Sequence, residues 1–301
     1  MLTFDPKEEA VAKVHGYLLG AIAPRPIAFA STIDKDGNVN LSPYSFFNCF
    51  GANPPTLVFS PARRVRDNTI KHTLENIREV PEVVINIANY PMVEQMSLAS
   101  TEYDKGVNEF VKAGFEEAPS QRVKPPRVKD APASFECVVK EVIETGQDGG
   151  AGNLVICEVV LAHIREDILD ENKRIDPYKL DAVSRMGGNY YCRSTPDSIF
   201  EIEKPLQTKG IGVDGIPEPI RYSDVLTGNN LGRLGNVERL PSDDEVKAMA
   251  QDPEVKEMAN RFGNTASTYR RELHKLAQKY LEKGETAQAW QVLLQDPEVQ
   301  K

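Results

Sequence analysis

The stretch PRPIAFASTIDKDGNVNLSPYSFFNCF, residues 24–50, decides the fold class of this chain. Two apolar runs, residues 26–33 and 38–47, flank the sequence Asp34-Lys35-Asp36-Gly37, which is typical of a hairpin turn. Similar short runs follow along the chain, several of them alternating apolar and polar residues, at residues 55–61, 83–88, 134–144 and 154–164. A doubly wound parallel sheet would need helices alternating regularly with these strands, and they do not.

We therefore predict a mainly β fold, an antiparallel barrel that is closed or partly closed. Apolar residues at helical spacing predict short helices at residues 69–80, 92–100 and 107–114 between the strands. The proline- and lysine-rich residues 118–132 are predicted to be an irregular connection, and residues 145–153 a loop.

The composition changes after Pro205. We predict two parts: a barrel over residues 1–205, and a loop-rich connection with a helical C-terminal extension over residues 206–301. The pentapeptide QDPEV occurs at Gln251 and again at Gln295, and its Asp-Pro pair is typical of a helix start. We interpret it as a repeated helix start rather than a repeat protein. The extension is expected to serve oligomer contacts or a partner.

Charge and composition exclude several classes of function. The chain has 301 residues, with 36 Lys and Arg against 45 Asp and Glu, and a net charge of −9 disfavours nucleic acid as a partner. No apolar run approaches the length of a membrane span, and the charged start lacks the apolar core of a signal peptide, so we predict a cytoplasmic protein. The four cysteines and four histidines show no metal-ligand spacing; we expect buried, reduced thiols and no metal.

A glycine pattern needs separate treatment. Residues 210–215, GIGVDG, match the G-x-G-x-x-G pattern of dinucleotide-binding loops. That loop requires a strand before it and a helix after it, and Pro217 and Pro219 are predicted to prevent the helix. The glycines at residues 149–152 lead into a predicted strand and fail the same requirement. We expect no dinucleotide site of this type.

The residues 42–50, SPYSFFNCF, mix aromatic rings with hydrogen-bonding side chains. A flavin needs such a site, because its flat aromatic ring has polar edges and its phosphate end needs a separate anion site. Ser42, Ser45 and Asn48 can supply donors and acceptors. In an extended segment Phe46 and Phe47 point to opposite faces, so that one packs in the core while the other can line a pocket.

A candidate anion site lies at the sequence RRVRDNT, residues 63–69, directly before the predicted helix. Helix N-termini attract anions through free N–H groups and the positive end of the helix dipole. Arg66, Asn68 and Thr69 would add charge and short donors. The alternative is a plain N-cap by Asp67 or Asn68 beside solvated arginines.

Two further segments are candidates for ligand contact. Arg25 lies between two prolines that fix its direction; the alternative is a salt bridge at the rim of the barrel. In the sequence SRMGGNYYCR, Gly187 and Gly188 allow close approach of the backbone, and Tyr190 and Tyr191 could stack on a ligand. The alternative there is a turn at a strand end with packed tyrosines.

Five segments in this order resemble the flavin reductase-like, FMN-binding split-barrel family, which includes flavoredoxins. They are residues 24–61, RDNTIKHTLENIRE, EYDKGVNEFVKAGF, LVICEVVLAHI and RMGGNYYCR, and the resemblance covers about residues 10–200. It implies an antiparallel split β-barrel of Greek-key type with short helices, usually a homodimer with FMN near the subunit interface.

The resemblance also implies site residues. Residues 40–48 would hold the isoalloxazine edge and ribityl chain, Ser60 would lie near the phosphate end, and residues 66–69 would bind the phosphate. Many members carry Lys-Asp-Thr where this chain has Asp67-Asn68-Thr69, which puts the individual phosphate contacts in doubt. The predicted FMN-binding residues are Arg25, Thr32, Ser42, Ser45, Phe46, Phe47, Asn48, Ser60, Arg66, Asn68, Thr69, Gly187, Gly188 and Tyr190.

His163, near the end of the last long strand, is the predicted catalytic residue, because members often carry a histidine there that approaches nicotinamide or flavin. The alternative is a histidine packed at a strand end.

The resemblance implies an NAD(P)H-dependent flavin reductase, in which the nicotinamide passes a hydride to flavin N5. Such a transfer needs orientation more than acid–base residues, because the cofactor carries the chemistry. Two alternatives stay open: a flavoredoxin-type FMN electron carrier that serves a partner redox protein, and a non-catalytic flavin-binding protein. The sequence does not decide between NADH and NADPH, nor whether a partner oxygenase receives the reduced flavin.

Overall fold

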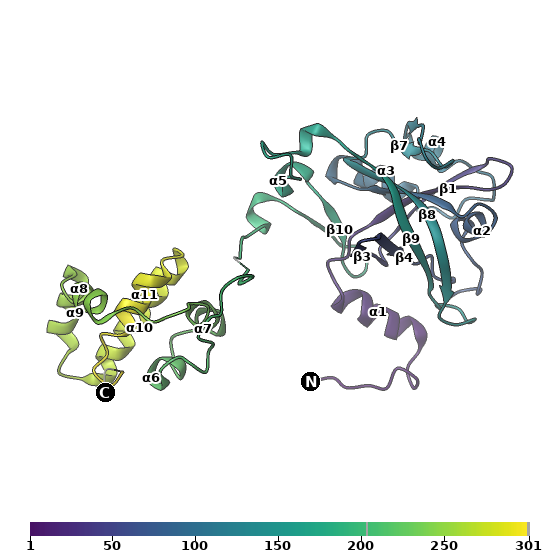
Figure 1. The fold of residues 1–301 in the computed structure, drawn as a ribbon. Coiled ribbons are helices and arrows are strands. Elements are labelled where there is room, and N and C mark those ends of the chain that lie inside the picture. Colours follow the sequence, from purple (N-terminus) through teal and green to yellow (C-terminus); the bar gives the residue numbers. More distant parts are fainter. Residues whose placement is uncertain (203, 300–301) are drawn as a thin grey trace. The chain divides into compact units, whose positions relative to one another are not determined.

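A computed structural model describes residues 1–202 and 204–299 of the chain (Figure 1). The chain folds into two compact units, Met1–Phe200 and Glu201–Lys301. Each unit has hydrophobic clusters of its own. The predicted boundary, between residues 205 and 206, lies a few residues further along the chain.

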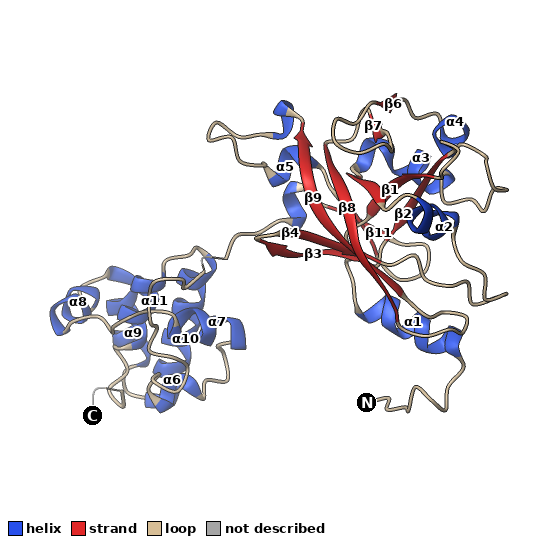
Figure 2. Cartoon of the chain, turned by 45° about the vertical axis from the view of Figure 1, so that its right-hand side comes forward, coloured by secondary structure: helices blue, strands red, loops and turns tan. Residues whose placement is uncertain are grey.

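The first unit is built on one antiparallel sheet of seven strands (Figure 2). In spatial order its strands are β2 (Val39–Tyr44), β1 (Ala28–Ile33), β5 (Glu82–Ile87), β8 (Ala133–Glu144), β9 (Asn153–Ile164), β4 (Pro55–Phe59) and β3 (Phe47–Ala52). Each neighbouring pair is antiparallel. The predicted mainly antiparallel β architecture is confirmed.

All six residues of β1 are buried, which explains why its sequence is apolar without alternation. Phe29 belongs to a cluster that packs with the helices after β5, whereas Ala28 and Ala30 belong to a cluster with Phe59. A strand that is covered on both faces reads as a continuous apolar run.

The predicted strand at residues 38–47 is interrupted. Strand β2 ends at Tyr44, and β3 begins at Phe47 after a bend at Ser45 and Phe46. Because β2 is the first strand of the sheet order and β3 the last, this bend joins the two edges of the sheet. Phe47 packs against the core, whereas Phe46 is 39% exposed and lies edge-on to the ring of His15.

Short helices surround the sheet: α1 (Val11–Ala21), α2 (His72–Glu79), α3 (Val93–Leu98), α4 (Glu109–Ala113) and α5 (Pro177–Leu180). The three predicted helices are present with shorter bounds. Helix α1 was not predicted. None of its residues is buried, and a helix that does not face the core lacks the apolar periodicity by which a helix is recognised in a sequence.

Two small strand pairs complete the unit. Strands β6 (Glu117–Ala118) and β7 (Arg127–Val128) pair within the connection that was predicted to be irregular. Strands β10 (Val183–Arg185) and β11 (Tyr191–Arg193) form a hairpin around the two glycines.

The second unit is helical, with α6 (Glu218–Arg221), α7 (Gly228–Gly235), α8 (Asp243–Met249), α9 (Pro253–Phe262), α10 (Ala266–Glu282) and α11 (Thr286–Leu293). Trp290 is fully buried in its core, and its indole Nε1 donates to the carbonyl of Leu234 at 3.0 Å. Asp252 of the first QDPEV caps α9 through the N–H groups of Glu254 and Val255. The second QDPEV starts a turn and not a helix, so the predicted repeated helix start is wrong for this copy; there Asp296 accepts from the N–H of Glu298.

Two sequence predictions are corrected. Helix α6 forms despite its prolines, because Pro217 is its N-cap and Pro219 stands in the first turn, where no N–H donor is required. Of the thiols predicted to be buried, Cys137 and Cys157 are, but Cys49 on the edge strand β3 is exposed and Cys192 is half-buried. Burial raises the pKa of Cys137 to about 12.

Within the described residues, no cluster of side chains could hold a metal ion, and no helix is long and apolar enough to cross a membrane.

Candidate functional site

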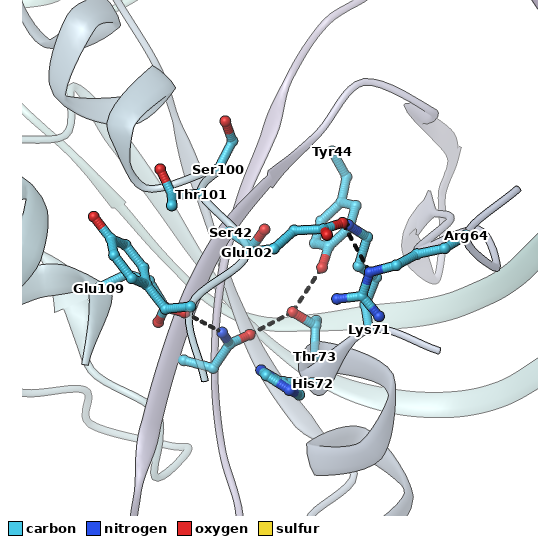
Figure 3. A pocket seen from close by; sticks show the side chains of 12 residues that line it. Ser42, Tyr44, Arg64, Lys71, His72, Thr73, Ser100, Thr101, Glu102 and Glu109 are labelled. Carbon is cyan, nitrogen blue, oxygen red and sulfur yellow. Dashed lines mark hydrogen bonds and ion pairs between the residues drawn. The ribbon is translucent and has the colours of Figure 1, made fainter. Parts of the chain in front are cut away.

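A pocket opens beside the edge strand β2 in the first unit (Figure 3). Its walls come from β2, the turn before α2, the first turn of α2, the loop after α3, and α4. The lining residues are Asn40, Ser42, Tyr44, Arg64, Lys71, His72, Thr73, Ser100, Thr101, Glu102, Tyr103 and Glu109. The space inside is about 20 Å³, enough for about one or two water molecules.

The first turn of α2 supplies free hydrogen-bond donors to this pocket. Lys71 is the N-cap, with extended φ and ψ, and no side chain caps the helix. Over the described part of the chain, the N–H groups of His72 and Thr73 have no hydrogen-bond acceptor. An uncapped helix start beside the side chains of Arg64 and Lys71 is an arrangement that binds anions.

A chain of hydrogen bonds fixes the pocket floor. The hydroxyl of Tyr44 donates to Thr73 Oγ1 at 2.8 Å, and Thr73 Oγ1 donates to Asn40 Oδ1 at 2.5 Å. Asn40 Nδ2 donates to Glu109 Oε1, and the N–H of Leu41 donates to Glu109 Oε2, both at 2.9 Å. These contacts tie β2, α2 and α4 together, so the floor is rigid.

Glu109 is the buried end of that chain. Burial raises the pKa of Glu109, although the hydrogen bonds from Leu41 and Asn40 oppose the change. Burial likewise raises the pKa of Tyr44.

A second carboxylate lies at the mouth. Glu102 Oε1 accepts from Arg64 Nε at 2.8 Å and from Lys71 Nζ at 3.2 Å, and Glu102 Oε2 accepts from Arg66 Nη2 at 3.1 Å. The Arg64–Glu102 contact is drawn in Figure 3. Hydrogen bonds from Arg64 and Lys71 lower the pKa of Glu102 to about 2.

The residues predicted for the phosphate, Arg66, Asn68 and Thr69, lie in the turn before the helix. Thr69 Oγ1 donates to Asp67 Oδ1 at 2.6 Å and accepts from Arg64 Nη1 at 2.9 Å. Asn68 has a left-handed φ of 58°, and its side chain donates to the carbonyl of Gln147. These side chains are therefore already partnered within the protein.

The helix start was predicted too early in the sequence. The alternative, an N-cap by Asp67 or Asn68, is wrong, because Lys71 occupies the N-cap position and its side chain makes no capping hydrogen bond. In the structure Lys71-His72-Thr73, and not Asp67-Asn68-Thr69, stands at the start of the helix.

Other predicted FMN-binding residues are spread over the barrel. Ser42 lines the pocket. Thr32 is buried in β1 and accepts from Asn76 Nδ2 at 3.2 Å. Ser60 is buried and accepts from the N–H of Asn153 at 2.9 Å. Asn48 is exposed on β3 and accepts from the N–H of Cys49. Of these four, Ser42 alone lies in the pocket wall; the roles of the others stay predictions.

A second group of predicted residues gathers at the end of α1. Arg25 is buried, and its Nη1 donates to the carbonyls of Leu19 and Ile22, each at 2.6 Å, at the C-terminal end of the helix. Its Nη2 donates to the carbonyl of Met186 at 3.1 Å, and its Nε contacts Ser45 Oγ at 3.4 Å. The alternative of a rim salt bridge is wrong, because Arg25 donates to carbonyls, two of them at the end of α1; its contact with a ligand stays a prediction. Burial lowers the pKa of Arg25, and nearby Arg185 adds to this.

The two glycines belong to the same region. A Cβ at Gly187 would stand 3.0 Å from the Cα of Gly20, so the close approach there is between the hairpin and α1. Gly188 has a φ of +58° in the turn of the hairpin, and Tyr190 is 75% exposed. Tyr191 packs under the guanidinium of Arg185.

Replacing Arg25 with Leu should release α1. Four hydrogen bonds from a charged group are lost, two of them to carbonyls at the end of α1, and we expect the local opening free energy of α1 to fall by about 2 kcal/mol. Trypsin cleavage at Lys13, within α1, should then become roughly thirtyfold faster, because cleavage follows the opened population. The control is Arg165→Leu at an exposed site; equal cleavage rates for the two variants would contradict the role of Arg25.

His163 lies on β9, outside the pocket lining. Its Nε2 is 2.7 Å from Oε1 of the buried Glu136, which also accepts from the N–H groups of Gln121 and Arg122. Burial acts to raise the pKa of Glu136, but the hydrogen bonds from Gln121, His163 and Arg122 outweigh it and lower that pKa. These contacts hold the connection at residues 118–132. The catalytic role of His163 stays a prediction.

Sequence reasoning missed most of the charged residues in the pocket: Arg64, Lys71, His72, Glu102 and Glu109. Two signals were present. Lys71 and His72 were assigned to the interior of the predicted helix, and the segment EYDKGVNEF, which carries Glu102 and Glu109, was used for the resemblance without choosing site residues from it.

Comparisons with known proteins agree with this architecture. The family described as "Flavin reductase like domain" matches residues 20–181. An uncharacterized protein of Aquifex aeolicus is 36% identical over 193 residues, which are 64% of this chain and 96% of that protein.

Solved structures match as well. Nitrilotriacetate monooxygenase component B from Bacillus cereus is 30% identical, with a TM-score of 0.61, over 68% of this chain and 98% of that one. The 2-nitrobenzoate 2-nitroreductase of Pseudomonas fluorescens is 28% identical, with a TM-score of 0.60, over 69% of this chain and 100% of that one. A structure from Shewanella frigidimarina described as having a split barrel domain shares the fold, at 24% identity and a TM-score of 0.57, over 68% of this chain and 100% of that one.

The predicted split barrel with short helices and a helical extension is thus confirmed. With a family match over more than half of its residues, this chain belongs to the flavin reductase like domain family.

Proposed function

We propose that the chain binds FMN with the phosphate at the start of α2 and acts as an NAD(P)H-dependent flavin reductase. The observation that carries the proposal is the uncapped first turn of α2, with Arg64 and Lys71 beside it, in a barrel of a flavin-binding family. A phosphate dianion suits free N–H groups and two cations, because charge-assisted hydrogen bonds are the strong ones.

The rest of the flavin would extend from this pocket along residues 42–48. In this proposal the pocket takes the phosphate end, because its lining carries the cations and the helix start. Ser42 stands in its wall, and the chain then runs through the bend at Ser45 and Phe46. We propose that the ribityl chain follows this segment and that the exposed Phe46 borders the ring.

A homodimer would complete the ring site. On β3, Phe50 is 68% exposed, and on β9 the apolar residues Leu154, Val160 and Ile164 are also exposed. Exposed apolar side chains on a sheet are candidates for a protein contact. A second copy on this surface would cover the flavin ring and exclude water from it.

The reaction is a hydride transfer. Bound FMN supplies the accepting flavin N5. The residues of this chain would bind the phosphate end over the rigid floor of Asn40, Thr73 and Glu109, and the ring beside Phe46 would stay accessible to the nicotinamide. This division of roles requires no nucleophile and no general base.

The electron acceptor is proposed from one relative. The Bacillus cereus protein is a monooxygenase component B, so we propose that the reduced flavin made by this chain passes to a partner oxygenase. An electron carrier that retains FMN and exchanges electrons with another redox protein is the alternative.

Anaerobic absorbance spectra test the proposal. The purified full chain is mixed with FMN, and NADH and NADPH are added in separate samples. We expect the flavin band to bleach with at least one nucleotide, which also identifies the donor. A band that persists with both donors would contradict the reductase and favour the electron carrier. If the chain does not bind flavin, both functions are contradicted and only the fold assignment stands.

A further inference from the structure

The cations of the proposed phosphate site already hold an anion that belongs to the protein. One oxygen of Glu102 contacts both Arg64, at 2.8 Å, and Lys71, at 3.2 Å. These are the two cationic side chains that line the pocket apart from the ionisable His72. Within the described structure, the carboxylate therefore occupies the position that a phosphate oxygen would take between them.

The two carboxylates of the pocket differ in their freedom to move. Glu109 is buried, and both of its oxygens accept hydrogen bonds from β2, so it cannot leave without exposing those donors. Glu102 stands in the irregular segment between α3 and α4, and its side chain is 42% exposed. It can turn toward water without leaving a buried backbone donor unpaired, and the contacts given up to Arg64 and Lys71 would be replaced by those of the bound phosphate.

Arg66 gives Glu102 a second position. Its guanidinium is at the rim, 73% exposed, and contacts the other oxygen of Glu102 at 3.1 Å. A rotation about this contact would release Arg64 and Lys71 while Glu102 keeps one ion pair. It would also enlarge a pocket that is small as it stands.

We infer that Glu102 is an internal substitute for the ligand phosphate, which holds Arg64 and Lys71 in place in the empty site and turns away toward Arg66 when phosphate binds. This inference rests on the proposed FMN site. It makes Glu102 a specificity-determining residue: a ligand with a phosphate must displace it, whereas a flavin without a phosphate does not compete with it.

Hydrogen bonds from Arg64 and Lys71 keep the pKa of Glu102 at about 2, so this carboxylate is ionised throughout the neutral range. The competition is then present at every pH at which the protein would be assayed. The other ionisable groups of the pocket are Tyr44, His72, Tyr103 and Glu109.

The experiment compares Glu102→Gln with the wild type, using the full chain and titration with FMN and with riboflavin. Removing one competing charge should tighten FMN binding about tenfold and leave riboflavin affinity unchanged. Glu116→Gln is the matched control, because Glu116 is an exposed carboxylate paired with Lys129 and is not part of the pocket lining. Glu102→Ala, with circular dichroism to verify folding, should change FMN affinity in the same direction.

Weaker or unchanged FMN binding in both Glu102 variants would overturn the inference while the proposed function stands, because the carboxylate would then only order the cations. If the variants bind FMN and riboflavin more tightly by the same factor, competition between Glu102 and the phosphate is also excluded. If neither the wild type nor the variants bind FMN, the proposed function fails and the inference fails with it.

Discussion

The double variant Arg64→Gln/Lys71→Gln should bind FMN about a hundredfold more weakly than the wild type, because each lost charge-assisted contact costs about 1.5 kcal/mol. Riboflavin affinity should change little, since riboflavin lacks the phosphate. Both dissociation constants are measured by quenching of flavin fluorescence. In the structure, Arg64 and Lys71 flank the uncapped start of α2.

The control for this prediction is Lys129→Gln/Arg165→Gln, which removes two exposed cations that pair with other surface carboxylates. Its FMN affinity should equal that of the wild type at the same ionic strength. If both double variants bind FMN with equal affinity, the start of α2 is not part of the FMN site. Parallel loss of riboflavin affinity in Arg64→Gln/Lys71→Gln would indicate a general disruption of the pocket instead.

The second unit should lose stability in mild acid because of His274. This histidine is buried in α10, its Nδ1 lies 2.7 Å from Ser223 Oγ, and its Nε2 has no partner in the described structure. Ser223 Oγ accepts from the N–H groups of Val225 and Leu226, so its proton goes to Nδ1 and the ring is neutral. Burial lowers the pKa of His274 to about 4.

The sign of the pH dependence follows from this shift. The unfolded chain binds the proton near pH 6.5, whereas the folded unit binds it only near pH 4, so the unfolded state is favoured as the pH falls through this window. The contribution of His274 to the free energy of unfolding is complete above pH 6.5. At pH 4 about 3 kcal/mol of this contribution is lost.

Trp290 makes the measurement specific to this unit, because it is the one tryptophan of the chain and lies in the helical core. Urea unfolding is followed by its fluorescence between pH 4 and pH 7. The variant His274→Asn keeps an acceptor near Nδ1 but does not titrate, so its unfolding free energy should depend less on pH by about 3 kcal/mol over this range. The same pH dependence in both proteins would contradict a buried neutral His274.

Much of the barrel could be predicted from local sequence. The runs that became β1, β4, β5, β8 and β9 are apolar or alternating, and the structure places each strand within about two residues of the predicted bounds. The break between Tyr44 and Phe47 was not predicted, because it comes from closure of the sheet between β2 and β3. Local apolar content is the same on both sides of such a bend.

The site was harder to predict than the fold. The approximate region of the anion site was correct, but the helix start was misplaced, since Asp67 and Asn68 are better N-caps by residue type than Lys71. In the structure Asp67 accepts from Thr69 within its own turn, and the side chain of Asn68 donates to the carbonyl of Gln147. Glu102 and Glu109 reach the pocket only through the packing of α3 and α4 against β2, which the sequence alone does not show.

The most direct test of the central claim is a crystal structure of the full chain with FMN. The account predicts the phosphate within hydrogen-bond distance of the N–H groups of His72 and Thr73, with Arg64 and Lys71 bound to it. A phosphate held by residues 66–69 or by the Arg25 region, with the pocket beside β2 still closed by Glu102, would contradict the account.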